Sequence, residues 1–314
     1  MRKYSTYFIV LAALLWSLDT LLRKPLTGHL NSSTIVFFEH AFGVLLLLPV
    51  LIKGSRVFQT LSRKDWLALL FIGIGGSALA TYFFTLSFSY VSPSVAILLQ
   101  KVQPLIALGL AAVLLKERLA KTFWLWGLVA ILGAYFVSFP KGIDALSVFE
   151  TRGVYFALLA AVLWGGSTVF GRHLVKKMTF PTLTALRLLT AFIFLSFFIT
   201  ARRELSSLAD VSLGDLGSLI AITLFTGTGA LLLYYYGLKG TKASVATIAE
   251  LFFPFSAVVI NWIFLNERLD TIQIIGGIVL MGAIYMTQRA GKKDIDQRDH
   301  YAASIATQEP SIIK

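Results

Sequence analysis

The sequence contains no cysteine, which excludes disulfide frameworks, metal–thiolate sites and thiol redox chemistry. Charged residues are also scarce, at 14% of 314 residues, whereas hydrophobic residues make up 57% and the mean hydropathy is +0.78. A G-x-x-x-x-G-K-[ST] phosphate-binding loop is missing, so the sequence gives no sign of ATP hydrolysis. The histidines are scattered and without metal-ligand spacing. We therefore expect no cofactor and no metal site. The four histidines are His29, His40, His173 and His300.

Long apolar runs dominate the rest of the chain. A run of about 20 apolar residues is long enough to cross a bilayer as a helix. We count ten, at 6–24, 33–52, 66–89, 94–115, 121–139, 153–174, 181–201, 215–238, 244–265 and 270–288. They leave no room for a soluble catalytic domain, so we predict an all-α membrane protein with ten transmembrane helices. Residues 289–314 lack an apolar pattern and are predicted to be a disordered cytoplasmic tail.

The net charge of +12 would suit a nucleic-acid-binding protein, but its distribution indicates a membrane topology instead. If the N-terminus is cytoplasmic, 19 of the 28 lysines and arginines fall in cytoplasmic segments and 7 in outer segments. This asymmetry is the positive-inside pattern of a multi-pass protein with both termini in the cytoplasm. We expect the cytoplasmic membrane of a prokaryote, with the lipid bilayer as a partner and no nucleic acid.

Two stretches of the chain repeat each other. Residues 94–119 (SVAILLQKVQPLIALGLAAVLLKERL) and 244–269 (SVATIAELFFPFSAVVINWIFLNERL) share S-V-A, a proline and E-R-L at an offset of 150 residues. We predict a first five-span repeat at 1–140 and a second at 141–288. Because five is odd, the second repeat must be inverted in the membrane. Inverted repeats are typical of transporters that open a mid-membrane site to either side in turn.

The repeated block and an A-A-x-x-W opening at Trp16 and Trp164 resemble the drug/metabolite transporter superfamily, in its ten-span EamA-like branch. The resemblance implies a central cavity surrounded by spans 1, 3, 4, 6, 8 and 9. It also implies a substrate among amino acids, other metabolites, cations or drugs. Arg187 matches an arginine common in such proteins, but its repeat mate is Glu39. Anion binding by an arginine in the second span, as in relatives, is therefore not expected in the first half of this chain.

Ionisable residues lie inside predicted spans, where a charge costs about 2.5–3.5 kcal/mol at the bilayer centre, and four of them form two pairs at matched depth. Glu39 and Lys101 are at similar depth in the outer half of the membrane, and Arg187 and Glu250 are at similar depth in the inner half. We predict that each acid–base pair gates its own side of the transporter. The alternative is a pair of structural salt bridges.

Three further polar residues lie near the outer half. His40, beside Glu39, suggests either a proton-linked group or a hydrogen-bonded packing role. Asp19 and Arg23 are spaced i, i+4, so we expect them to pair with each other in a structural role.

A polar cluster in the fourth span is the leading candidate for substrate contact. Gln100, Lys101 and Gln103 precede Pro104, which removes a backbone hydrogen bond and is expected to kink the helix. Pro254 repeats this geometry in span 9. Kinked helices at mid-membrane are common ligand sites, although a harmless kink remains the alternative.

Aromatic residues are expected to complete the substrate site. Trp16 and Trp164 lie near the middle of spans 1 and 6, away from the interfaces where tryptophan gathers. They can form cavity walls or hold a cation against a ring, or they can be simple packing. Tyr82 and Tyr234 are candidates to add hydroxyl groups.

Together these features predict a secondary transporter, and more specifically an exporter, of small polar organic metabolites such as amino acids. Transport of cationic amines or drugs is the alternative, and protons are a candidate coupling ion. A membrane-embedded enzyme or an assembly protein is the rival of another class. The sequence does not fix the oligomeric state.

Overall fold

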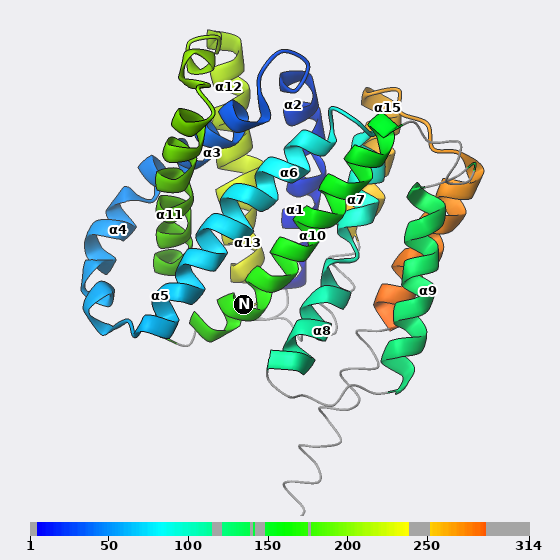
Figure 1. Cartoon of the computed structure of the whole chain (residues 1–314), viewed down its shortest axis with the longest axis horizontal. Coiled ribbons are helices and arrows are strands. Elements are labelled where there is room, and N and C mark those ends of the chain that lie inside the picture. Colours follow the sequence, from blue (N-terminus) through cyan, green and yellow to red (C-terminus); the bar gives the residue numbers. More distant parts are fainter. Residues whose placement is uncertain are drawn as a thin grey trace, which may run out of the picture.

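The chain folds into a bundle of helices in the computed structural model, which describes residues 5–114, 121–138, 141, 148–174, 177–238 and 252–286 (Figure 1). Within these ranges the secondary structure is helical and contains no strand. The predicted all-α fold class is therefore confirmed.

Helices are present in every apolar run that the sequence predicts as a span. The first half contains α1 (Ser5–Ser17), α2 (Asp19–Leu26), α3 (Ser32–Leu46), α4 (Leu48–Gly54), η2 (Ser55–Thr60), α5 (Arg63–Leu70), η3 (Phe71–Leu79), α6 (Ala80–Ser87), α7 (Pro93–Gln100), α8 (Gln103–Leu114) and α9 (Lys121–Ser138). The second half contains α10 (Val148–Leu174), α11 (Phe180–Ala201), η5 (Leu205–Leu208), α12 (Leu213–Ala221), η6 (Ile222–Gly227), α13 (Thr228–Leu238), α15 (Phe252–Phe264) and a helix at Thr271–Met286.

Among the described residues, four continuous helical stretches are long and apolar enough to cross a membrane: Arg63–Ser87, Glu150–Gly171, Phe180–Ala201 and Leu213–Tyr234. The bent pair α3 and α4, which meet at 58°, makes a fifth if it counts as one span. Shorter apolar helices lie at Trp124–Val137, Phe252–Phe264 and Thr271–Met286. The count of ten spans and their inverted arrangement stay predictions.

Several predicted spans are interrupted, and proline accounts for two of the breaks. Pro49 follows the break at Leu47 between α3 and α4, and Pro104 follows the break at Lys101–Val102 between α7 and α8. Proline lacks the N–H that would bond to the carbonyl four residues earlier, and its ring crowds the preceding turn. A third break, at Leu18, separates α1 from α2 without a proline at that position.

The third and eighth predicted spans share local features at an offset of 150 residues. Ser62 and Asp65 form a capping box at the start of α5, and Ser212 and Asp215 form one at the start of α12. Each cap is followed by a π-helical segment, η3 in one span and η6 in the other. Figure 1 shows α5 to α6 and α12 to α13 running in opposite directions. These features support the predicted inversion.

Helices from the two halves pack closely against each other. The first-half helix α1 contacts α13 and α15, and the second-half helix α10 contacts α6, α7, α8 and η3. Small residues allow this approach: a Cβ on Gly76 would lie 2.2 Å from Ser167 Oγ, and one on Gly73 would lie 2.6 Å from Thr190 Cβ. Large apolar side chains such as Trp124 (67% exposed) and Phe197 (72% exposed) point outward, as a lipid-facing surface requires.

The turn that follows the π-helical segment η6 requires glycine at position 229. A Cβ on Gly229 would lie 1.8 Å from the backbone oxygen of Leu224, which has no flexible way to retreat. We expect Gly229→Ala to lower the free energy of unfolding by about 1–3 kcal/mol, the usual range for overpacking. Thermal unfolding in detergent measures the effect. Gly217→Ala in α12 is the control, because nothing lies within 4 Å of its Cβ position. Equal unfolding temperatures for the two variants would contradict the prediction.

Candidate functional site

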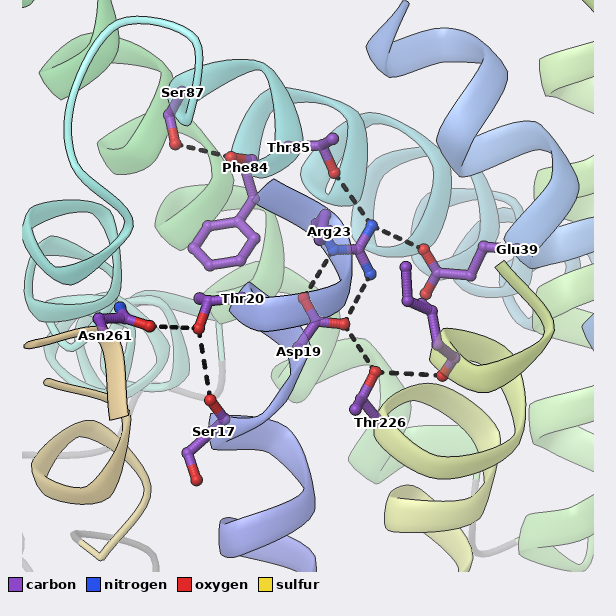
Figure 2. Close-up of polar contacts among 11 residues, drawn as sticks. Ser17, Asp19, Thr20, Arg23, Glu39, Phe84, Thr85, Ser87, Thr226 and Asn261 are labelled. Carbon is purple, nitrogen blue, oxygen red and sulfur yellow. Dashed lines mark hydrogen bonds and ion pairs between the residues drawn. The ribbon is translucent and has the colours of Figure 1, made fainter. Parts of the chain in front are cut away.

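A buried cluster of charged residues joins the first two predicted spans (Figure 2). Arg23 of α2 is 3% exposed and lies between two carboxylates. Its Nε donates to Asp19 at 2.6 Å and its Nη1 donates to Glu39 of α3 at 2.9 Å. A charge placed in an apolar bundle needs such partners, because the loss of hydration costs several kcal/mol per ion.

Threonine hydroxyls complete the hydrogen bonding of this cluster from two other helices. Thr85 of α6 accepts a bond from Arg23 at 3.1 Å. Thr226 of η6 donates to Asp19 at 2.6 Å, so the cluster also reaches the second half of the chain (Figure 2). The charged cluster, as we call Asp19, Arg23, Glu39, Thr85 and Thr226, therefore links four predicted spans.

The structure confirms one predicted ion pair and corrects another. Asp19 and Arg23 pair as their spacing predicted. Glu39 was predicted to bind Lys101, but its carboxylate binds Arg23 instead. The Lys101 ammonium lies 4.4 Å from the ring centroid of Phe253. Depth along a helix cannot reveal which neighbour a side chain faces, and the break at Leu18 turns Arg23 toward α3.

Arg187 of α11 binds the π-helical segment η3. Its Nε donates to Ser77 Oγ, and its Nη2 donates to the carbonyl oxygen of Gly76 at 2.9 Å. Its predicted partner Glu250 lies outside the described residues. His40 is buried, and its Nδ1 lies 2.8 Å from the carbonyl oxygen of Val36 on the same helix.

Several predicted substrate residues come together around an aromatic residue that the sequence reasoning missed. Trp16 of α1 lies 5.4 Å from Tyr234 of α13 and 6.3 Å from Phe253 of α15, measured between ring centroids. With Lys101 over the Phe253 ring, these four residues form what we call the central aromatic group. Phe253 follows Phe252 in a run of apolar residues, and nothing in its pattern singles it out.

The other predicted substrate residues occupy three places. Trp164 of α10 lies 5.2 Å from Phe84, and both belong to the apolar core that also contains Trp16 and Phe253. Tyr82 instead packs against Phe198 of α11, at 5.2 Å between ring centroids. Gln103 begins α8, where its carbonyl faces Gly165 of α10.

Gln100 and Pro254 are the two remaining predicted residues, and both were expected to lie at helix kinks. The buried Oε1 of Gln100 has no hydrogen-bond partner in the described part of the chain. Pro254 is the third residue of α15, and the residues before Phe252 are outside the described ranges.

A buried polar ladder connects α2, α7 and α15. Thr20 donates to Asn261 Oδ1 at 2.5 Å, and Asn261 Nδ2 donates to Ser94 Oγ at 3.1 Å. These three residues are at most 1% exposed. Ser94 in turn donates from its backbone N–H (3.2 Å) and its Oγ (2.9 Å) to Glu267 Oε2. Asn261 was not predicted, because a single amide in an apolar helix gives no sign of its partners.

A helical membrane protein is the class that these apolar helices and enclosed charges define. The chain belongs to the EamA-like transporter family, which matches residues 4–139 and 151–289. It is therefore a membrane transporter rather than an enzyme.

The similar proteins agree with this family. The riboflavin transporter ImpX of Fusobacterium nucleatum is 31% identical over 88% of this chain and 94% of its own length. The pseudopaline exporter CntI of Pseudomonas aeruginosa is 26% identical, with coverages of 92% and 98%. A solved crystal structure with 18% identity and a TM-score of 0.62 covers 93% of this chain and 99% of its own, which shows a shared fold.

Removal of Arg23 should be far more damaging than removal of an exposed arginine. Arg23→Met leaves Asp19 and Glu39 buried without their counter-charge, and we expect a loss of about 3–5 kcal/mol in the free energy of unfolding. The control is Arg202→Met, because Arg202 is about half exposed and pairs with Glu204, so at most about 1 kcal/mol should be lost. Denaturant titration in mixed micelles measures both. Similar losses would show that the charged cluster contributes little to stability.

A second prediction concerns Glu267, which lies in the loop after α15. Burial raises the pKa of Glu267, partly opposed by the two Ser94 bonds and by the positive charge of Lys24. The ionised form therefore costs free energy in the folded protein. This cost is absent below the ordinary glutamate pKa of about 4.3 and grows as the pH rises through the raised pKa.

Wild-type protein should therefore lose thermal stability relative to Glu267→Gln as the pH rises from about 4 to about 7. Asp270→Asn, a nearby exposed position, supplies the control for removal of a carboxylate. Melting temperatures across this range measure the difference. A constant gap between wild type and Glu267→Gln would contradict the prediction.

Proposed function

We propose that this transporter carries small polar organic metabolites, such as amino acids, across the cytoplasmic membrane of a prokaryote by alternating access, and that it acts in export. The proposed architecture is ten spans in two inverted repeats with both termini in the cytoplasm. The observation that carries the proposal is the central aromatic group. Its rings and its ammonium come from both halves of the chain, which is where an inverted-repeat transporter binds its substrate.

Residues beside this group support a polar substrate. Lys101 is the residue at which α7 ends, and the residue before it, Gln100, has a buried Oε1 acceptor without a hydrogen-bond partner in the described part of the chain. Because Pro104 has no N–H, it cannot bond to the backbone carbonyl of Gln100 either. A positive group and an unpaired acceptor on consecutive residues suit a zwitterion, which brings both an anionic group and hydrogen-bond donors.

A planar aromatic metabolite such as riboflavin is the second candidate. The ring centroid of Trp16 lies 5.4 Å from that of Tyr234 and 6.3 Å from that of Phe253, so the three rings form an aromatic surface. A flat heterocycle can stack on such a surface. The 31% identical relative is named as a riboflavin transporter.

We further propose that the charged cluster, with His40, acts in gating or proton coupling. Glu39 and Asp19 are each about 15% exposed, so they are within reach of solvent while they bind Arg23. A gate of this kind can open because the hydration that the ions recover offsets much of the attraction that they lose.

Uptake into proteoliposomes tests both substrate classes. A radiolabelled mixture of the twenty amino acids and radiolabelled riboflavin are offered separately, each with and without a pH gradient. Lys101→Ala and Trp164→Ala should reduce transport of the true substrate at least about tenfold, the loss expected when a charged or stacking contact is removed.

Matched controls are Lys141→Ala and Trp124→Ala, because both side chains are exposed on the surface. Full transport by the Lys101 and Trp164 variants would overturn the assignment of the site. Failure of wild-type protein to move either substrate class would overturn the proposed substrates.

A further inference from the structure

The matching ends of the two repeated blocks, residues 94–119 and 244–269, are a feature that the proposed substrate site does not explain. Each copy begins with S-V-A and ends with E-R-L. In the structure, Glu267 of the second copy accepts two hydrogen bonds from Ser94 of the first copy, at 2.9 Å from Oγ and 3.2 Å from the backbone N–H. The glutamate that ends one copy therefore binds the serine that begins the other.

The chemistry of this contact is that of a carboxylate at the N-terminus of a helix. Ser94 is the second residue of α7, where backbone N–H groups have no partner inside the helix and a negative charge is favoured. Ser92 already caps this helix by accepting a bond from the Val95 N–H. Helix α7 therefore does not depend on Glu267 for its local cap, and the second half of the chain supplies an additional contact.

The contact between Glu267 and Ser94 is continuous with the buried polar ladder. Asn261 donates to Ser94 Oγ and accepts from Thr20 of α2, so α7, α15 and α2 are held together by one chain of hydrogen bonds. The charged group that acts on Glu267 is Lys24 of α2, whose Nζ donates to the carbonyl oxygen of Phe88. Helix α2 also carries Arg23, so the same helix joins this contact to the charged cluster.

We propose that Glu267 and Ser94 form a latch that holds the outer side of the transporter closed and that breaks when this side opens. The proposal rests on the proposed alternating-access function. Glu267 acts as a positioning residue: it holds α7 of the first half against the end of α15 of the second half. The latch also gives the repeated block a role, because each half supplies one end of the contact.

The test uses accessibility, which needs no substrate. The chain has no cysteine, so a single Ala96→Cys, fully buried two residues after Ser94 in α7, reports opening to a membrane-impermeant thiol reagent added outside. Glu267→Gln and Ser94→Ala should each increase the labelling rate about tenfold, the change expected on loss of a hydrogen bond to a charged group. The double variant should increase the rate by less than the product of the two single changes, because both variants act on the Oγ–carboxylate bond of the same contact.

Asp270→Asn is the matched control and should label like the parent, since it removes an exposed carboxylate from the same loop. In a second measurement, cysteines at positions 94 and 267 are joined by a short bifunctional thiol reagent. The joined protein should resist labelling at Ala96→Cys far more than a sample in which each cysteine is capped separately. Because this closes the latch covalently, it tests the proposal even if Glu267→Gln folds poorly.

Unchanged labelling in both Glu267→Gln and Ser94→Ala would overturn the latch, as would a lower melting temperature without faster labelling. Equal labelling of joined and separately capped protein would do the same. Failure of the proposed function has a different signature, because wild-type protein would then transport nothing in proteoliposomes, whatever the labelling results.

Discussion

The enclosed guanidinium of Arg23 is the constraint on which the packing of α2 against its neighbours depends. An ion buried among apolar helices must be matched, and two carboxylates and a hydroxyl group on three helical elements provide the match. The break at Leu18 makes this possible, because it lets α2 depart from the direction of α1. The consequence is that α2 is held to α3 by an ion pair and to α6 by a hydrogen bond from Arg23. Asp19 of α2 also accepts a hydrogen bond from Thr226 of η6, and Thr20 donates one to Asn261 of α15.

A comparable arrangement, with charges exchanged, occurs where Arg187 meets η3. Arg187 and Glu39 are repeat mates, yet one is a donor and the other an acceptor. Arg187 binds Gly76 and Ser77 of the first-half π-helical segment, whereas Glu39 lies against the second-half segment, where Thr223 bonds to its backbone oxygen. π-Helical turns widen a helix and are frequent at functional sites. Each half thus presents its widened segment to a charged residue of the other half.

The sequence was sufficient to predict the helices, but not which of the candidate site residues pair with one another. A long apolar run is buried in lipid or protein, where a helix satisfies its backbone hydrogen bonds, and each predicted range contains helix. Trp16, Lys101 and Tyr234 stood out because such residues are costly or unusual at mid-span, and they lie close together. Phe253 could not stand out among apolar neighbours, and the partner of Glu39 depended on a helix break that no proline signals. Pairing depends on rotation about the helix axis, and periodicity in a uniformly apolar helix does not encode it.

Close apolar packing in one part of the protein and side-chain hydrogen bonds in another suit a transporter that alternates between two conformations. Apolar packing and close small-residue contacts, such as Gly76 against Ser167, join η3 to α10 and do not exchange easily with water. Helices α2, α7 and α15 are instead joined by hydrogen bonds between side chains, each with a modest net free energy because water can replace the partner. A change of a few kcal/mol can shift such an equilibrium without disturbing the packed interior. Motion is therefore expected where polar contacts meet solvent, with the glycine-lined packing between η3 and α10 as the fixed body about which these helices move.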